Sequence, residues 1–167
     1  WIRRVRPQVV LTFDPIGGYR HPDHIACHQA TVLAFEAAGD PQRFPNGLPA
    51  YQPAKLYFHT FRRPWLRYGV RLLRLFGQDP RHWGRNKDID LVDIAQSEFP
   101  VHARIDIRPV ADRKERASAC HASQLMPRPR GLGRFLFRFS EAEEVYMRAH
   151  PPAPPQLREH DLFEGLP

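Results

Sequence analysis

The residues from Gly17 to His24 combine side chains that could hold a metal ion and act on a substrate. They read Gly-Gly-Tyr-Arg-His-Pro-Asp-His, which places two imidazoles, a carboxylate and a phenol in one short stretch. Imidazole is a common ligand of catalytic metals, and a neighbouring carboxylate fixes its tautomer and raises its basicity. Hydroxyl and imidazole groups also stabilise the negative charge that develops in acyl transfer. The pattern is compatible with a metal site, and a capped helix start would explain the same residues equally well.

A complete metal site needs more than this loop. A mononuclear zinc enzyme uses three protein ligands and keeps one position open for water. Only His21, Asp23 and His24 are close together here, and neighbours in sequence rarely converge on one ion. We therefore expect further ligands from elsewhere. His28 stands four residues after His24 and could add one, but we favour a histidine that packs beside the site.

The loop is predicted to join a buried strand to a helix. Residues 8–13 are mostly β-branched or apolar, as in a strand, and a helical pattern runs from Pro22 to Gly39. This order places the loop at the carboxyl end of a strand, where open α/β sheets bind ligands. Asp14 ends the strand, and it either supports the site from behind or forms an Asx turn before Pro15.

The remaining sequence predicts more strands and helices and a separate tail. We expect the end of a helix at residues 1–6, strands at 54–60, 103–107 and 144–148, and helices at 65–76 and 110–124. Prolines at 151–155 predict an extended, polyproline-like segment lying across the body. The chain is therefore divided into one α/β domain, residues 1–150, and a tail, residues 151–167.

The strand, loop and first helix resemble the second signature of the PIG-L/LmbE family of zinc-dependent N-deacetylases. The likeness covers Val9–Pro15, the Gly-Gly-Tyr and His-Pro-Asp-His runs and the helix to Gly39, and it returns loosely over residues 103–124. It implies the C-terminal portion of a Rossmann-like α/β sandwich with a basic helical insertion. It also implies removal of the acetyl group from an N-acetylated amino sugar or glycoconjugate. Within the family, an amidase for thiol conjugates is the alternative.

The resemblance assigns a role to each reactive side chain of the loop. His24 would be the ligand of Zn²⁺, or of another divalent metal. His21 would stabilise the oxyanion or protonate the leaving amine, and Asp23 would orient it and balance its charge. Tyr19 would reach over the substrate carbonyl. Each role suits the chemistry of its side chain.

Other assignments concern the surroundings of the loop. Gly18 would leave room for the substrate, and His121 would line its pocket, unless it is an ordinary histidine at a helix end. The family's other signature, an AHPDDE-like loop that supplies two ligands and the general base, does not occur in these 167 residues. We expect that loop upstream of Trp1. On its own the chain is then predicted to bind zinc poorly and to have little hydrolase activity.

The net charge of +7 comes largely from arginines in residues 62–85 and 128–138. Such patches attract nucleic acid, anionic lipid or anionic substrates. Residues 62–76 combine an arginine stripe with an apolar stripe formed by Leu66, Val70, Leu73 and Phe76. This pattern fits a membrane-surface helix, a lid over the site or, as we favour, a helix docked on the body. A similar patch at 132–139 makes an anionic lipid surface a partner worth testing.

A non-catalytic basic module that binds nucleic acid or anionic lipid is the rival hypothesis. It explains the charge but leaves the loop unexplained, so nucleic acid is not an expected partner. Cys27 and Cys120 are expected to be reduced, buried residues of a cytoplasmic protein. No signal peptide is recognised at Trp1, and no apolar run suits a membrane span. The sequence leaves homo-oligomerisation open.

Overall fold

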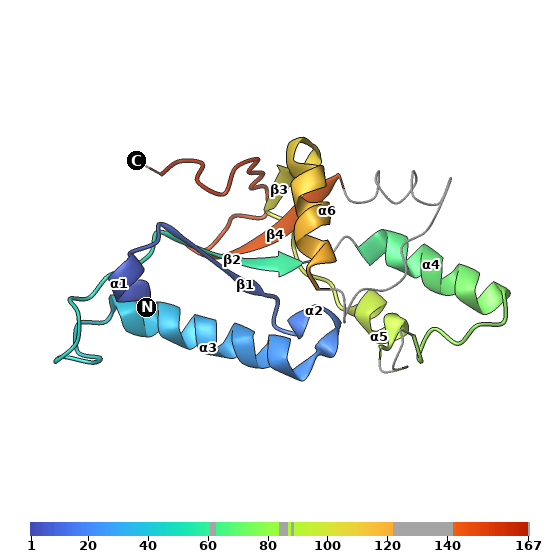
Figure 1. Cartoon of the computed structure of the whole chain (residues 1–167), viewed down its shortest axis with the longest axis horizontal. Helices are drawn as coiled ribbons and strands as arrows, with labels where there is room; N and C mark the ends of the chain where they lie inside the picture. The colour runs from blue at the N-terminus through green and yellow to red at the C-terminus, as the bar shows by residue number, and fades with distance from the viewer. Residues whose placement is uncertain (61–62, 84–86, 88, 122–141, 167) are drawn as a thin grey trace.

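The computed structural model describes residues 1–60, 63–83, 87, 89–121 and 142–166. Four strands form one mixed sheet in the order β1-β2-β4-β3 (Figure 1). The strands are β1 (Val9–Phe13), β2 (Lys55–Thr60), β3 (Ala103–Asp106) and β4 (Glu143–His150). The helices are α1 (Ile2–Val5), α2 (Gly17–Arg20), α3 (Pro22–Gly39), α4 (Arg63–Leu75), α5 (Leu91–Gln96) and α6 (Ala111–Ala119), with a short 3₁₀ helix at Arg108–Val110. The predicted α/β class is confirmed.

The first crossover unit sets the position of the reactive loop. β1 and β2 are parallel, with Val9 opposite Lys55 and Phe13 opposite His59, and α3 lies between them in sequence. β2 and β3 both pair with β4 in antiparallel fashion. The loop therefore leaves the carboxyl end of β1 beside the carboxyl end of β2, as predicted.

Side chains of β2 alternate between two cores, as the pleat of a strand requires. Leu56 and Phe58 pack with Phe35 of α3 on one face. Tyr57 packs with Ala103 and Tyr146 on the other face, together with Leu162 of the tail. The sheet is thus covered by α3 on one side and partly by the tail on the other.

Arg3 ties the start of the chain to the end of α3. Its guanidinium donates hydrogen bonds to the carbonyl oxygens of Ala37, Ala38, Asp40 and Arg43 at 2.7–3.0 Å. The last carbonyls of a helix have no partners within the helix, and a cation is favourable at its C-terminus. A single side chain therefore caps α3 and holds α1 against it.

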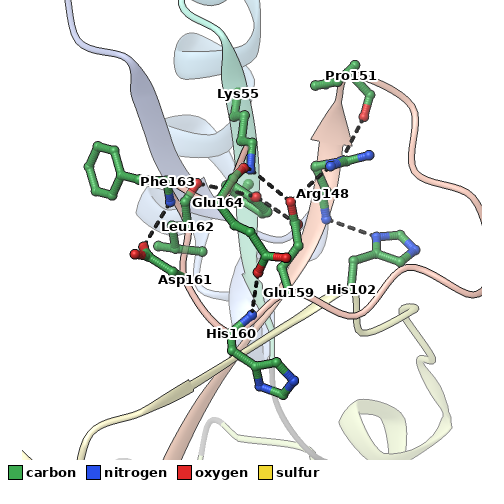
Figure 2. A network of polar contacts seen from close by, with 11 residues as sticks. Lys55, His102, Arg148, Pro151, Glu159, His160, Asp161, Leu162, Phe163 and Glu164 are labelled. Carbon is green, nitrogen blue, oxygen red and sulfur yellow. Dashed lines mark hydrogen bonds and ion pairs between the residues drawn. The ribbon is translucent and has the colours of Figure 1, made fainter. Parts of the chain in front are cut away.

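A buried ionic network fastens the tail to the sheet (Figure 2). Glu159, only 3% exposed, accepts hydrogen bonds from Lys55 at 2.8 Å, from the hydroxyl of Tyr57 at 2.8 Å and from Arg148 at 3.0 Å. The backbone N–H of Glu159 also donates to the carbonyl of His102, and its carbonyl accepts from the N–H of Arg104. Turns interrupt the tail before and after this residue, so it is not one continuous extended segment.

These partners change the ionisation of Glu159. Burial disfavours its charged form, but the hydrogen bonds from Lys55 and Tyr57 and the charges of Lys55 and Arg148 outweigh burial. The pKa of the Glu159 carboxyl is therefore held below its usual value. Burial, together with the bond to the Glu159 carboxylate, raises the pKa of the Tyr57 hydroxyl, which stays a donor.

Most predicted elements are confirmed, with boundaries shifted by a few residues. The helix expected at 110–124 is observed to Ala119, and residues after His121 lie outside the described part, as does the basic patch at 132–139. α5 was missed; Asp90 caps it by accepting from the N–H groups of Val92 and Asp93. Its six residues are too few to reveal a helical period.

Two predictions about burial are wrong. Cys27 and Cys120 are exposed rather than buried, and both are free thiols, as expected. Phe76 was grouped with the apolar stripe that was expected to dock on the body, but it follows the end of α4 and is exposed. Among the described helices, none is both long enough and apolar enough to cross a membrane.

Candidate functional site

A buried carboxylate shapes the loop after β1. Asp14 is fully buried, and its Oδ1 accepts a hydrogen bond from the backbone N–H of Gly18 at 2.7 Å, while its carbonyl accepts from the N–H of Gly17. Both glycines have positive φ, 63° and 72°, a region that other residues enter at a cost. Asp14 thus organises the loop, which goes beyond an Asx turn before Pro15.

His24 is oriented by the same loop. Its Nδ1 lies 3.2 Å from the carbonyl oxygen of Gly17, and because a carbonyl can only accept, Nδ1 must carry the proton. The ring also stacks on Phe13, with centroids 4.0 Å apart and planes 5° apart. The hydrogen bond from Nδ1 leaves the lone pair of Nε2 for a ligand, which is the arrangement found in most metal-binding histidines. The available nitrogen of His24 therefore suits coordination of a zinc ion.

His21 presents the opposite tautomer. It caps α3, because its Nδ1 accepts a hydrogen bond from the backbone N–H of Asp23 at 3.2 Å. In the neutral ring the proton must then reside on Nε2, which makes that atom a donor. The carboxylate of Asp23 lies 3.9 Å from Nδ1 and is almost fully exposed. Asp23 therefore orients His21 mainly through its backbone.

Three rings of the loop form one cluster. The ring of His21 lies 4.8 Å from that of His24, and the Tyr19 ring meets both edge-on, at 5.7 Å and 5.1 Å. Tyr19 is more than one-third exposed, whereas Gly18 beneath it is buried. The structure therefore brings together the three side chains that the sequence singled out, as an imidazole lone pair, an imidazole donor and a phenol.

His28 has the packing role that we favoured. Its Nδ1 donates to the carbonyl oxygen of Phe13 at 2.8 Å, and its ring meets the ring of Phe58 edge-on at 4.6 Å. His28 thus joins α3 to the sheet one turn below His24. His121 is exposed at the end of α6, and none of its contacts within the described residues joins it to the loop.

Sequence reasoning missed a clamp on the loop. Arg20, which follows Tyr19 with a positive φ of 65°, forms an ion pair with Asp93 of α5, including a 3.0 Å bond from Nη2 to Oδ1. The hydrogen bond to Asp93 raises the pKa of Arg20. The partners are 73 residues apart in sequence, so no local pattern could have revealed the pair.

His59 at the end of β2 was also missed. It lies opposite Phe13 in the strand register, and its ring is 5.3 Å from that of Tyr146. Burial lowers the pKa of His59, so the neutral imidazole is favoured near this end of the sheet. A lone histidine within a strand gave no signal of this position.

Within the described residues, no group of three histidine, cysteine or acidic side chains could hold a metal ion.

Gly17→Ala is expected to lower the free energy of unfolding by about 1–3 kcal/mol through backbone strain alone. A Cβ on Gly17 would lie 2.8 Å from the backbone nitrogen of Ile25 and 2.9 Å from the Cβ of His24, so it would also displace the first turn of α3. Urea unfolding monitored by circular dichroism measures the change.

Gly69→Ala is the matched control for this prediction. Gly69 lies inside α4, and a Cβ there would meet no atom within 4 Å. Because alanine is the better helix former, this variant is expected to gain up to about 1 kcal/mol. Equal effects of the two substitutions would contradict the close packing of the loop against α3.

Comparisons with known proteins place this chain among N-deacetylases by sequence. Residues 1–35 match the family model described as PIG-L: GlcNAc-PI de-N-acetylase. The chain is also similar to proteins named 1D-myo-inositol 2-acetamido-2-deoxy-alpha-D-glucopyranoside deacetylase. The protein from Tsukamurella paurometabola is 38% identical over 176 residues, which cover 99% of this chain and 56% of that protein.

Two more of these deacetylases show the same relation. The Rhodococcus jostii protein is 35% identical over 172 residues, or 99% of this chain and 57% of that protein. The Geodermatophilus obscurus protein is 39% identical over 124 residues, or 74% of this chain and 42% of that protein. The chain thus spans about half the length of the curated relatives it matches.

Proposed function

Because this chain belongs to the PIG-L/LmbE family of N-deacetylases, we propose that it supplies part of the active site of a zinc-dependent amide hydrolase. The observation that carries the proposal is the orientation of His24. Its Nδ1 is held by Gly17, so its Nε2 is available to a metal beside the donor of His21 and the phenol of Tyr19.

The proposed substrate is an N-acetylated glucosaminide. The relatives are named for a 2-acetamido-2-deoxy-glucopyranoside of myo-inositol, and we extend that substrate class to the complete protein. Hydrolysis would release acetate and a primary amine. An amidase acting on thiol conjugates would use the same groups on a different amide.

Zinc supplies two effects in such reactions: it lowers the pKa of water to about 7 and polarises the scissile carbonyl. In this chain His24 would hold the ion through Nε2. The other ligands and the general base are assigned to a part of the protein outside these residues, since one histidine cannot complete a site of three ligands.

The remaining residues would act on the substrate directly. The Nε2 proton of His21 can be donated to the oxygen that becomes negative or to the departing nitrogen, which needs a proton when the carbon–nitrogen bond breaks. The hydroxyl of Tyr19 can donate to the same oxygen. Arg20, paired with Asp93, and Asp14, bonded to Gly18, would keep these groups in place.

The test is amine release by the protein expressed from its complete reading frame and purified with zinc. A panel of N-acetylglucosaminides, including an inositol glycoside, and an acylated thiol conjugate is assayed for new primary amine. His21→Ala is expected to lower kcat by about 10²–10³-fold while zinc stays bound. His160→Ala, on the exposed part of the tail, is the control and should match the wild type.

The outcomes separate the parts of the proposal. Release from the thiol conjugate alone would identify the amidase. No release from any compound, with zinc bound, would contradict the substrate class. Full activity of the His21→Ala variant would contradict the role of His21.

A further inference from the structure

α4 has two different apolar faces, and one of them is exposed. Leu66, Val70 and Leu73 face the body, and Val70, which is 6% exposed, is buried where α4 packs against α5. A second stripe consists of Tyr68, Leu72, Leu75 and Phe76, with exposures of 64%, 54%, 79% and 73%. Spacings of three and four residues place Tyr68, Leu72 and Leu75 on one side of the helix. Phe76 follows the last residue of α4, and its backbone N–H still donates to the carbonyl of Leu72. The docked helix that we favoured from the sequence is thus observed, but it leaves large apolar side chains in water.

The exposed stripe is bordered by unpaired positive charge. The sequence of α4 contains four arginines and no acidic residue. Arg67 is engaged, since it donates to the carbonyl of Ala95 at 3.1 Å and pairs with Glu98. Within the described part of the chain, neither Arg71 nor Arg74 has a hydrogen bond or ion pair, and both are exposed. Helical geometry places these two arginines between the packed face and the exposed stripe.

We propose that this face of α4 lies on the surface of an anionic lipid bilayer. The apolar side chains of Tyr68, Leu72, Leu75 and Phe76 would enter the boundary between headgroups and acyl chains. Arg71 and Arg74 would contact the anionic headgroups, with their methylene groups along the apolar stripe.

The chemistry of this face argues for a bilayer over other occupants. A second copy of the chain meeting it across a two-fold axis would bring the same arginines together, and like charges repel. Nucleic acid would satisfy the arginines but leave the apolar stripe in water. An anionic bilayer offers negative charge and an apolar interior side by side, which matches both halves of the surface.

The position of α4 is compatible with this contact. Figure 1 shows α4 at the opposite end of the molecule from α1, with α5 on its inner side. α5 in turn holds the reactive loop through the ion pair between Asp93 and Arg20. A bilayer on the exposed face of α4 would therefore be separated from the loop by α4 and α5. The proposal does not depend on the reaction catalysed there.

The test is cosedimentation of the protein from its complete reading frame with unilamellar vesicles. One set contains phosphatidylcholine alone, and the other contains phosphatidylcholine and phosphatidylglycerol. Wild-type protein is expected to sediment with the anionic vesicles, and more weakly as salt is raised. The Arg71→Gln/Arg74→Gln variant should bind them more than about tenfold more weakly. A loss of similar order is expected for Leu72→Ser/Phe76→Ser.

Two variants on other helices are matched controls. Arg113→Gln/Arg116→Gln removes two exposed arginines of α6, and Leu33→Ser removes an exposed leucine of α3. Both should bind anionic vesicles like the wild type, and all variants should keep the wild-type Tm because the altered side chains are exposed.

Three outcomes would overturn the proposal. The first is a wild-type protein that does not bind anionic vesicles. The second is binding that survives Leu72→Ser/Phe76→Ser. The third is a wild-type dimer, found by light scattering, that disappears in Leu72→Ser/Phe76→Ser while vesicles are not bound, which would assign the face to a second copy.

Discussion

His24→Ala is expected to remove stably bound zinc from the protein made from its complete reading frame, whereas His28→Ala is expected to retain the metal. Both histidines lie on α3, one turn apart, and both use Nδ1 to contact a backbone carbonyl. They differ in where the ring points. His24 faces the rings of Tyr19 and His21, while His28 packs on Phe58 in the core.

The size of this effect follows from the role of each nitrogen. Loss of a partner that only supports a metal ligand costs about 10–100-fold in affinity, so loss of the ligand itself should cost more than that. His28→Ala removes a half-buried hydrogen bond to the carbonyl of Phe13 and an aromatic contact, and it should cost about 1–3 kcal/mol of stability instead. The two substitutions thus act on different quantities.

Zinc content after dialysis against a mild chelator, measured by elemental analysis, separates the two variants. Unfolding in urea should show that His24→Ala is folded. Zinc retained by a folded His24→Ala protein would refute the assignment of this ligand. Loss of zinc from a folded His28→Ala protein would show that His28 contributes to the site directly.

Glu159→Ala is expected to destabilise the protein by about 3–5 kcal/mol, the cost of removing one partner from a buried ion pair. The substitution leaves the ammonium of Lys55, which is 4% exposed, without its carboxylate, and it removes the acceptor of Tyr57 and Arg148. Buried charges without partners are costly. Because these contacts join the tail to β2 and β4, release of the tail should accompany the loss of stability.

Urea unfolding of the complete protein measures this loss, and Glu164→Gln is the control. Glu164 also lies in the tail, but its side chain is exposed and its carboxylate accepts one bond, from the backbone of His160. It should change stability by less than about 1 kcal/mol. Equal effects of the two substitutions would show that burial of Glu159 is not what holds the tail.

The same network predicts a dependence on pH. The pKa of Glu159 is lower in the folded protein than in the unfolded chain, so the folded state favours the ionised carboxyl. Its stabilising contribution is fully present above the unfolded pKa of about 4.3, and it is lost as the pH falls through the folded value. Wild-type protein should therefore lose more stability on acidification than Glu159→Gln.

Local sequence was sufficient for the elements that surround the site. The β-branched run before Asp14 and the proline at the start of α3 predicted a strand, a loop and a helix in the observed order. Propensity and capping depend on residues close in sequence, so they can be recognised without the fold. The exposure of Cys27 and Phe76 could not be recognised in this way, because it depends on which surfaces the other elements cover.

The sequence by itself determined which side chains could do chemistry here: Tyr19, His21 and His24, crowded into one loop at the end of a strand. Tertiary structure decided which nitrogen of each imidazole is available, because the carbonyl of Gly17 and the N–H of Asp23 fix the tautomers. It also decided the long-range pairs. Arg20 meets Asp93 and Lys55 meets Glu159 across 73 and 104 residues. Such pairs form only when packing brings distant segments together, and the pair of Lys55 and Glu159 is also buried from water. That information is not contained in any local pattern.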